Sequence, residues 1–183
     1  MITNATITPA SSYEVVSLAL AKMQLRIESS FTAEDTLIQS MIASAVSAAE
    51  DYMGCKIVDS DVVLNLDELE DVINIPYPVR SVTSLKYFPT SGAEETMPDT
   101  DYELLRFGKE NGIRITAYWI PETDTRYDAV TIAFKTGYAT GTVPKPIIQA
   151  VLLQISDMYD RREDRVEVPL TMSTKLLRPY KLF

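Results

Sequence analysis

Apolar residues recur at helical spacing in three stretches of the chain, which predict helices within residues 17–26, 32–54 and 144–165. The second stretch is the longest, and small and large apolar residues together form a wide stripe along it. Thr32 is expected to cap its N-terminus, and Gly54 is expected to end it.

Between residues 56 and 143, apolar and β-branched residues alternate with polar ones, which is the pattern of β-strands. The stretch LLRFGKENGIRIT at 104–116 predicts a β-hairpin closed by a glycine-containing loop. The acidic stretch at 66–72 is expected to form a loop or a single helical turn. The predicted strands lie within residues 56–66, 81–88, 101–107, 112–118 and 129–138.

The order helix, helix, strands, helix predicts an α+β fold. A small bundle of three main helices, formed by residues 13–55 and 144–165, is expected to carry an antiparallel β module, residues 56–143, between its second and third helices. Residues 1–12, rich in Thr and Ser, are expected to form a flexible N-terminal arm. Residues 166–183 are left as a C-terminal tail.

The chain is acidic, but its charge is unevenly distributed. Residues 1–144 carry 21 acidic and 10 basic residues, a net charge of −11, whereas residues 145–183 carry 5 acidic and 7 basic residues, a net charge of +2. This balance argues against a general nucleic-acid binder, because neutralising phosphates requires clustered Lys and Arg. The split is compatible with association between the acidic and basic parts of different copies, and equally with a solvated acidic surface.

No catalytic constellation is visible. The chain has no histidine and one cysteine, Cys55, which excludes His-based triads, disulfide frameworks and multi-cysteine metal sites. A cluster of four carboxylates lacks the EF-hand pattern, so an exposed acidic loop is favoured over a metal site. We therefore expect no enzymatic activity, no cofactor and no metal. The clustered carboxylates are Asp67, Glu68, Glu70 and Asp71.

The N-terminal residues have no signal-peptide pattern, and the apolar stretch VVSLALA is too short to span a membrane. We expect an intracellular protein with no membrane segment.

The C-terminal tail, VPLTMSTKLLRPYKLF, combines three bases with large apolar side chains and contains no acidic residue. Val168 precedes a proline and is therefore disfavoured in helical conformation, so we expect the tail to leave the body as an extended docking arm. Folding of the tail onto its own helices is the alternative. The candidate docking residues are Leu176, Leu177, Arg178, Pro179, Tyr180 and Phe183.

The end of the third predicted helix is a candidate subunit interface, because its charges are suited to salt bridges between copies. An ordinary solvated helix end is the alternative. The candidate interface residues are Arg161, Arg162 and Glu163.

Three stretches carry motifs that belong together. A pair of helices ends in Glu-x-Tyr-x-Gly, a strand leads through a Gly-Tyr turn into a Pro-led helix with Tyr-x-x-Arg, and the chain finishes on Leu-Leu-x-Pro-Tyr and a base. In order and spacing they resemble the head–tail connector (adaptor, head-completion) proteins of long-tailed bacteriophages. The matching positions include Leu18, Lys22, Asp35, Glu50, Tyr52, Gly54, Gly137, Tyr138, Pro144, Tyr159, Arg162, Leu177, Pro179, Tyr180 and Lys181.

The resemblance implies a structural virion protein. Such proteins assemble as a ring, usually dodecameric, beneath the portal protein. The ring extends the DNA channel and provides the platform for a stopper or tail-completion protein. It also implies a place at the head–tail junction of the virion, with assembly in the host cytoplasm, and DNA that passes through without specific binding. The candidate docking residues would then contact the portal or a neighbouring subunit.

A virion β-rich module that binds a receptor or carbohydrate is the rival interpretation. Exposed aromatic side chains in a groove would favour it. Tyr118 and Trp119 are the candidates, and we expect them to cover the sheet instead.

Overall fold

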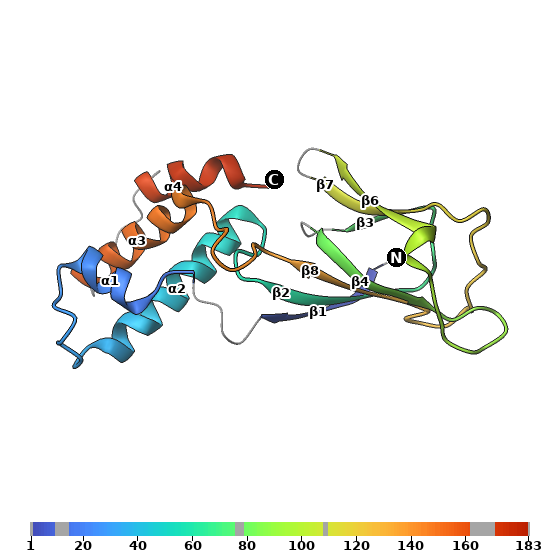
Figure 1. Ribbon diagram of the computed structural model, residues 1–183, viewed down its shortest axis with the longest axis horizontal. Helices are drawn as coiled ribbons and strands as arrows, with labels where there is room; N and C mark the ends of the chain where they lie inside the picture. The colour runs from blue at the N-terminus through green and yellow to red at the C-terminus, as the bar shows by residue number, and fades with distance from the viewer. Residues whose placement is uncertain (1, 10–14, 76–78, 108–109, 162–170, 183) are drawn as a thin grey trace. The chain divides into compact units, whose positions relative to one another are not determined.

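The chain forms four α-helices and two antiparallel sheets within the described residues, so the α+β class is confirmed. Its structure, a computed structural model, divides into two compact units (Figure 1). The β unit comprises Met1–Ser12 and Val58–Tyr138, and the helical unit comprises Tyr13–Ile57 and Ala139–Phe183. The described residues are 2–9, 15–75, 79–107, 110–161 and 171–182.

Helices occupy the three stretches where the apolar spacing predicted them, and a fourth helix lies in the C-terminal tail. In α2 the buried side chains repeat at three- and four-residue intervals, and they pack against α3. The helices are α1 (Leu18–Leu25), α2 (Asp35–Met53), α3 (Lys145–Asp160) and α4 (Met172–Leu177), followed by a short 3-10 helix, η2 (Arg178–Tyr180). None of the described helices has both the length and the apolar composition needed to cross a membrane.

The predicted N-terminal cap of α2 is wrong. The helix begins at Asp35, and the backbone N–H of Asp35 donates to the carbonyl of Thr32 at 3.2 Å, so residues 32–35 form a turn before the helix. The predicted stop is confirmed, because Gly54 adopts a left-handed conformation with φ 70°, and its N–H donates to the carbonyl of Glu50.

The β unit is built from two antiparallel sheets. One has the strand order β1-β2-β8-β4-β5 and the other β3-β7-β6. The predicted hairpin is confirmed as the pair β6–β7. The strands are β1 (Ile2–Pro9), β2 (Ser60–Leu66), β3 (Val72–Ile75), β4 (Val79–Tyr87), β5 (Glu95–Thr96), β6 (Tyr102–Phe107), β7 (Glu110–Ile115) and β8 (Val130–Thr136). A 3-10 turn, η1 (Asp99–Asp101), precedes β6.

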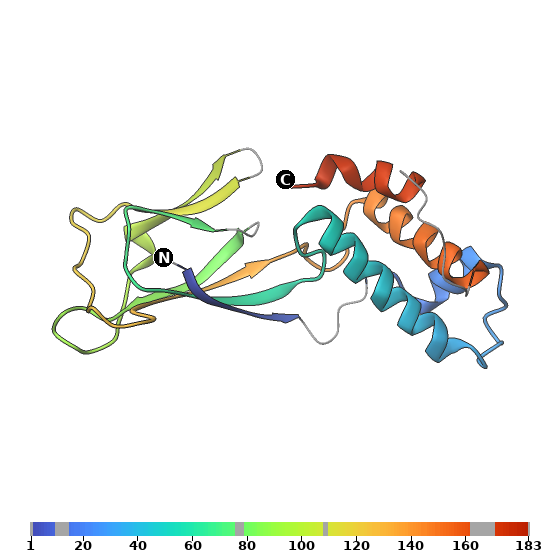
Figure 2. The same ribbon diagram turned by 180° about the vertical axis from the view of Figure 1, so that it is seen from behind.

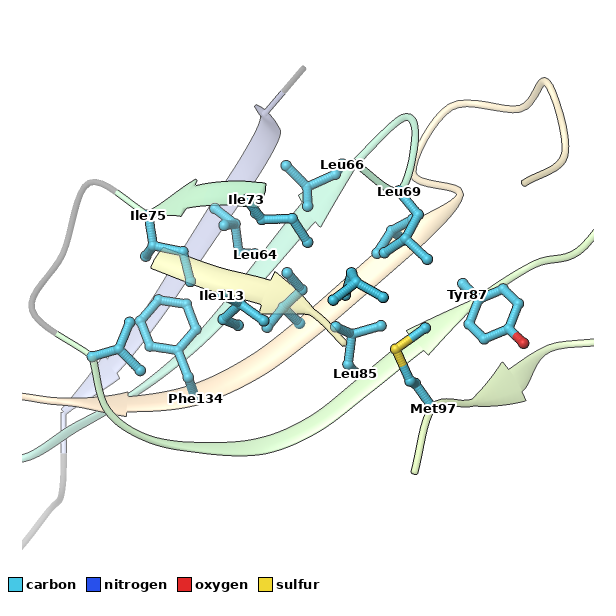
Figure 3. Close-up of a cluster of buried hydrophobic side chains, with 14 of the residues drawn as sticks. Leu64, Leu66, Leu69, Ile73, Ile75, Leu85, Tyr87, Met97, Ile113 and Phe134 are labelled. Carbon is cyan, nitrogen blue, oxygen red and sulfur yellow. The ribbon is translucent and has the colours of Figure 1, made fainter. Parts of the chain in front are cut away.

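Side chains from both sheets share one apolar core. Alternate residues of β2 and β8 are buried, as expected for strands with one face on a core. Figure 3 shows Leu64, Leu85 and Phe134 of the larger sheet among Ile75 and Ile113 of the smaller one. This shared core holds the β unit together.

One expectation about the β region is wrong. Residues 2–9 are not a flexible arm, because they pair with β2 as strand β1 along the edge of the larger sheet (Figure 2). Their Thr-rich sequence hid the strand, since an edge strand held by backbone hydrogen bonds needs few apolar residues. The expected acidic loop is confirmed for residues 67–71, which connect the end of β2 at Leu66 to the start of β3 at Val72.

Candidate functional site

The described part of the C-terminal tail folds onto its own helical unit. Helix α4 contacts α3 and α2, and it lies beside α3 in both views (Figures 1 and 2). Leu177 is fully buried, and the backbone N–H of Leu182 donates to the carbonyl of Met53 at 2.9 Å. The Lys181 ammonium lies 5.5 Å from the centre of the Tyr52 ring, a cation–π contact. The expected extended arm is therefore wrong for residues 171–182, and the alternative of a folded tail describes them.

Local sequence explains why this segment turns helical. The backbone N–H of Thr174 donates to the Thr171 hydroxyl at 3.5 Å, which places Thr171 at the N-cap. Residues in the Leu-Leu-Arg-Pro-Tyr motif then point in different directions. Leu177 enters the core, whereas Arg178 and Pro179 are exposed. The sequence pattern identified the segment, but it did not separate its buried side from its outer side.

The outer side of this segment, which we call the C-terminal face, carries most of the candidate docking residues. Leu176 and Tyr180 are half-buried, and Arg178 and Pro179 are exposed, as is Lys175. Phe183 lies outside the described residues. The C-terminal face is therefore basic and partly apolar.

The candidate interface at the end of α3 is described only in part. Arg161 is exposed, and its backbone N–H donates to the carbonyl of Asp157 at 3.1 Å. Arg162 and Glu163 lie outside the described residues. A subunit contact at these three positions stays a prediction.

Two motif positions form a partly buried ion pair at the start of α2. The Lys22 side chain on α1 is 5% exposed, and its ammonium lies 2.5 Å from an Asp35 carboxylate oxygen. It also donates to the carbonyl of Phe31 at 2.8 Å. Because a buried ammonium needs several partners, Lys22 fixes α1 and the loop before α2 in one arrangement.

A second buried charge fixes the end of α2. The Glu50 carboxylate accepts hydrogen bonds from the backbone N–H of Ile57 and from the Lys56 ammonium, both at 2.8 Å. Its side chain is largely buried, so the carboxylate is the hydrogen-bond acceptor for the backbone of the segment that follows the helix, where water has little access. The Lys22 and Glu50 positions of the motif thus stabilise the fold.

Exposed aromatic side chains gather on the loop between β7 and β8. Tyr118 is fully exposed, Tyr127 is 86% exposed and Trp119 is 66% exposed. The Arg126 guanidinium stacks over the Phe88 ring at 3.9 Å from its centre. The expectation that Tyr118 and Trp119 cover the sheet is wrong. We call Tyr118, Trp119 and Tyr127 the aromatic loop.

An open hollow of about 490 Å³ lies beside this loop. Its wall combines three acidic residues with one basic, two hydroxyl-bearing and one aromatic residue: Asp67, Glu68, Asp124, Arg126, Thr123, Thr125 and Tyr127. Within the described ranges no three His, Cys, Asp or Glu side chains are grouped closely enough to hold a metal ion.

The environment of the cysteine lowers its reactivity. Cys55 is buried, and burial, with the Glu50 carboxylate as a smaller cause, raises the pKa of its thiol from 9.0 to about 11. At neutral pH the thiol stays protonated, and a protonated thiol is a poor nucleophile.

Part of the sequence matches a known protein family. Residues 15–92, somewhat less than half of the chain, match the family described as phage gp6-like head-tail connector protein. These residues contain α1, α2 and the Lys22 and Glu50 ion pairs. No curated protein sequence matches the chain.

Solved structures share the fold across nearly the whole chain. A chain from the neck of an empty gene transfer agent (GTA) particle, computed with C6 symmetry, is 21% identical, with a TM-score of 0.75 over 96% of this chain and 95% of that one. A chain from the virion of the native GTA particle is 22% identical, with the same TM-score and coverage. A chain from the native neck computed with C12 symmetry is 20% identical, with a TM-score of 0.68 over 96% of this chain and 94% of that one.

At these identities the structural likeness establishes the fold, and the family match concerns the sequence of residues 15–92. Both findings agree with the motifs. The resemblance of this chain to the phage head–tail connector proteins is thereby confirmed.

Proposed function

We propose that this protein is a structural head–tail connector that forms a ring beneath the portal of a phage-like particle. The observation that carries the proposal is the coincidence of a connector-family match with a neck-protein fold over 96% of the chain. The absence of a catalytic constellation in the sequence is consistent with a structural role, and we propose no enzymatic activity.

The ring is proposed to contain twelve copies. Relatives in fold come from necks computed with C6 and C12 symmetry, both of which are compatible with twelve subunits around one axis. The portal protein is the proposed partner on the capsid side, and a stopper or tail-completion protein is the proposed partner on the tail side. The protein would assemble in the host cytoplasm and remain at the head–tail junction of the virion.

The charge of the β unit suits a channel that DNA crosses. Its residues include 15 acids and 7 bases, a formal net charge of −8, whereas the helical unit has 11 acids and 10 bases, a net charge of −1. Acidic walls repel phosphate, so DNA would slide past them without being held.

The C-terminal face is the proposed contact with the portal or with a neighbouring subunit. The burial of Leu177 anchors the segment on its own helices, which leaves Leu176, Arg178, Pro179 and Tyr180 to meet a partner. A basic, partly apolar surface fits an acidic rim on that partner.

Mixing the purified protein with its portal protein tests the function. We expect cryo-electron microscopy to show a ring seated on the portal, with light scattering reporting a complex much heavier than either protein alone. A chain that never associates with the portal, at any salt concentration, would rule out the connector role.

A second candidate is a virion module that binds a receptor or carbohydrate, and the aromatic loop favours it. Trp119 is the sole tryptophan, so its fluorescence reports on this loop alone. Binding of a soluble glycan to the loop would shift the emission to the blue and protect it from quenchers. Under the connector proposal, free glycans leave the emission unchanged.

A further inference from the structure

Strand β1 is attached to the rest of the β unit in an unusual way. The chain leaves β1 into the helical unit and returns to the β unit only at Val58, just before β2. In the described sheet β1 is an edge strand, and β2 is its hydrogen-bonded neighbour. The pairing with β2 therefore determines to which β unit the strand belongs, because no nearby covalent link fixes it there.

The pairing is made mainly by the backbone. The register runs without interruption from Asn4 opposite Asn65 to Pro9 opposite Ser60. Among residues 4–9 the side chains add little, because Asn4, Ala5, Thr6, Thr8 and Pro9 are exposed, and Ile7 is partly buried and packs against the core. Backbone pairing is the same for every copy of an identical chain, so β2 cannot distinguish its own β1 from that of a neighbour.

Strand β2 needs a partner on this edge. Its other edge pairs with β8, and its inward side chains Val62, Leu64 and Leu66 are buried. On its outward face Val63 remains 40% exposed. Without β1, the backbone groups of β2 would form an open edge, which is the kind of edge that recruits another strand.

The charge of the strand also permits exchange. Residues 1–12 contain no charged side chain, although they belong to a unit with a net charge of −8. A neighbour's β1 can therefore join an acidic β unit without adding like-charge repulsion. The rest of the β unit carries 15 acids and 7 bases, so like-charge repulsion opposes contacts between copies through it.

We infer that β1 is exchanged between subunits in the assembled protein, so that the β1 strand of one copy completes the larger sheet of the next copy at β2. In the single chain the strand occupies its own β2, and assembly replaces that pairing with an identical one between chains. The inference rests on the proposed ring, in which every subunit has a neighbour to donate the strand and another to receive it.

Cysteine pairs across the β1–β2 register test this. In a Cys55→Ala background, Thr6→Cys and Val63→Cys place two thiols at opposite, exposed positions. In dilute monomer we expect oxidation to close the disulfide within the chain. In rings formed at high concentration or on the portal we expect covalent dimers and higher multimers on a denaturing gel. A matched control, Val63→Cys with Ala133→Cys, spans β2 and β8 and should close within the chain in every state.

Mixing the two single variants, Thr6→Cys and Val63→Cys, gives a second readout that does not depend on the double variant folding. We expect mixed rings to yield disulfide-linked heterodimers, identified by mass. The exchange is overturned if rings of the double variant cross-link only within chains and rings of the mixed single variants give no heterodimer. That result leaves the connector proposal intact. A chain that stays monomeric even with its portal would overturn both.

Discussion

At the scale of single residues, Gly137 is a position that a side chain cannot occupy. It has φ +80°, and a Cβ built there would lie 2.1 Å from the carbonyl oxygen of Val58. Gly141 has a similar φ of +78° but open space around it, which makes it a matched control. We expect Gly141→Ala to lower the free energy of unfolding by about 1–2 kcal/mol, from backbone strain alone.

Gly137→Ala combines the same backbone strain with a steric clash, so we expect it to lower the free energy of unfolding by about 1–3 kcal/mol more than Gly141→Ala does. Denaturant unfolding of both variants measures the difference. Equal losses at the two positions would mean that the β unit can shift Val58 away at no cost.

Alkaline pH should weaken the β unit through Tyr102. Burial, and then a hydrogen bond donated to Asp99 at 2.7 Å, raise the pKa of Tyr102 to about 12. Because the folded state favours the neutral phenol, its contribution to stability is complete below the ordinary pKa of about 10 and is lost as pH rises toward about 12. Burial and Glu95 raise the pKa of Tyr87 in the same direction.

We expect Tyr102→Phe to flatten the fall in unfolding free energy over this alkaline range. Urea unfolding at several pH values, with ultraviolet absorbance of the ionised phenol as the second observable, measures it. An alkaline slope identical to that of the unmodified protein would show that Tyr102 does not couple to folding.

At the scale of elements, the contact between α2 and α3 is the centre of the helical unit. Ala45 on α2 is 1% exposed, whereas Ala48, three residues along the same helix, is exposed. We expect Ala45→Trp to overpack the contact and to cost about 1–3 kcal/mol, with a lower melting temperature. Ala48→Trp introduces the same side chain on the outer surface and should leave the melting temperature nearly unchanged. Similar losses in both variants would contradict the packing of α2.

Substitutions on the buried and the outer side of the C-terminal segment should affect different properties, stability and assembly respectively. Leu177→Ala empties a buried position, so we expect a loss of about 2–5 kcal/mol in unfolding free energy. Arg178→Glu alters an exposed residue and should change stability by less than about 0.5 kcal/mol. If the C-terminal face docks as proposed, Arg178→Glu should nevertheless prevent binding to the portal.

Lys145→Glu is the matched control for this experiment, because it reverses another exposed charge of the helical unit. Portal binding is measured by sedimentation. Normal portal binding by Arg178→Glu would exclude the portal as the partner of the C-terminal face and leave the contact with a neighbouring subunit.

At the scale of the whole molecule, charge should govern self-association. The bases of residues 145–183 lie in a helical unit whose net charge is −1, while the β unit carries −8, so repulsion between copies outweighs attraction. Raising ionic strength from about 0.01 M to about 0.1 M shortens the screening length from about 30 Å to about 10 Å. We expect the apparent mass at fixed protein concentration to rise with salt over this range, measured by light scattering. A fall in mass with salt would indicate association through opposite charges instead.

Periodicity alone determined the elements with continuous apolar patterns. The stripes of α2 and α3 and the alternation in β2 and β8 were readable, because a helix or strand that buries one face must repeat its apolar residues at that element's period. Charge and composition also pointed away from catalysis. Motif order identified the resemblance to head–tail connector proteins, which the comparison of residues 15–92 bears out.

Tertiary structure decided what periodicity does not encode. Strand β1 was hidden because its partner supplies backbone hydrogen bonds rather than an apolar face. Thr171 caps α4 locally, but the helix lies on its own helical unit because Leu177 is buried there, in a contact between segments far apart in sequence. Tyr118 and Trp119 are exposed, whereas their neighbours Ala117 and Ile120 pack against the core. Aromatic residues look the same in sequence whether they cover a sheet or face solvent. Local pattern records which face an element buries, whereas the partner that covers it is chosen only when the whole chain packs.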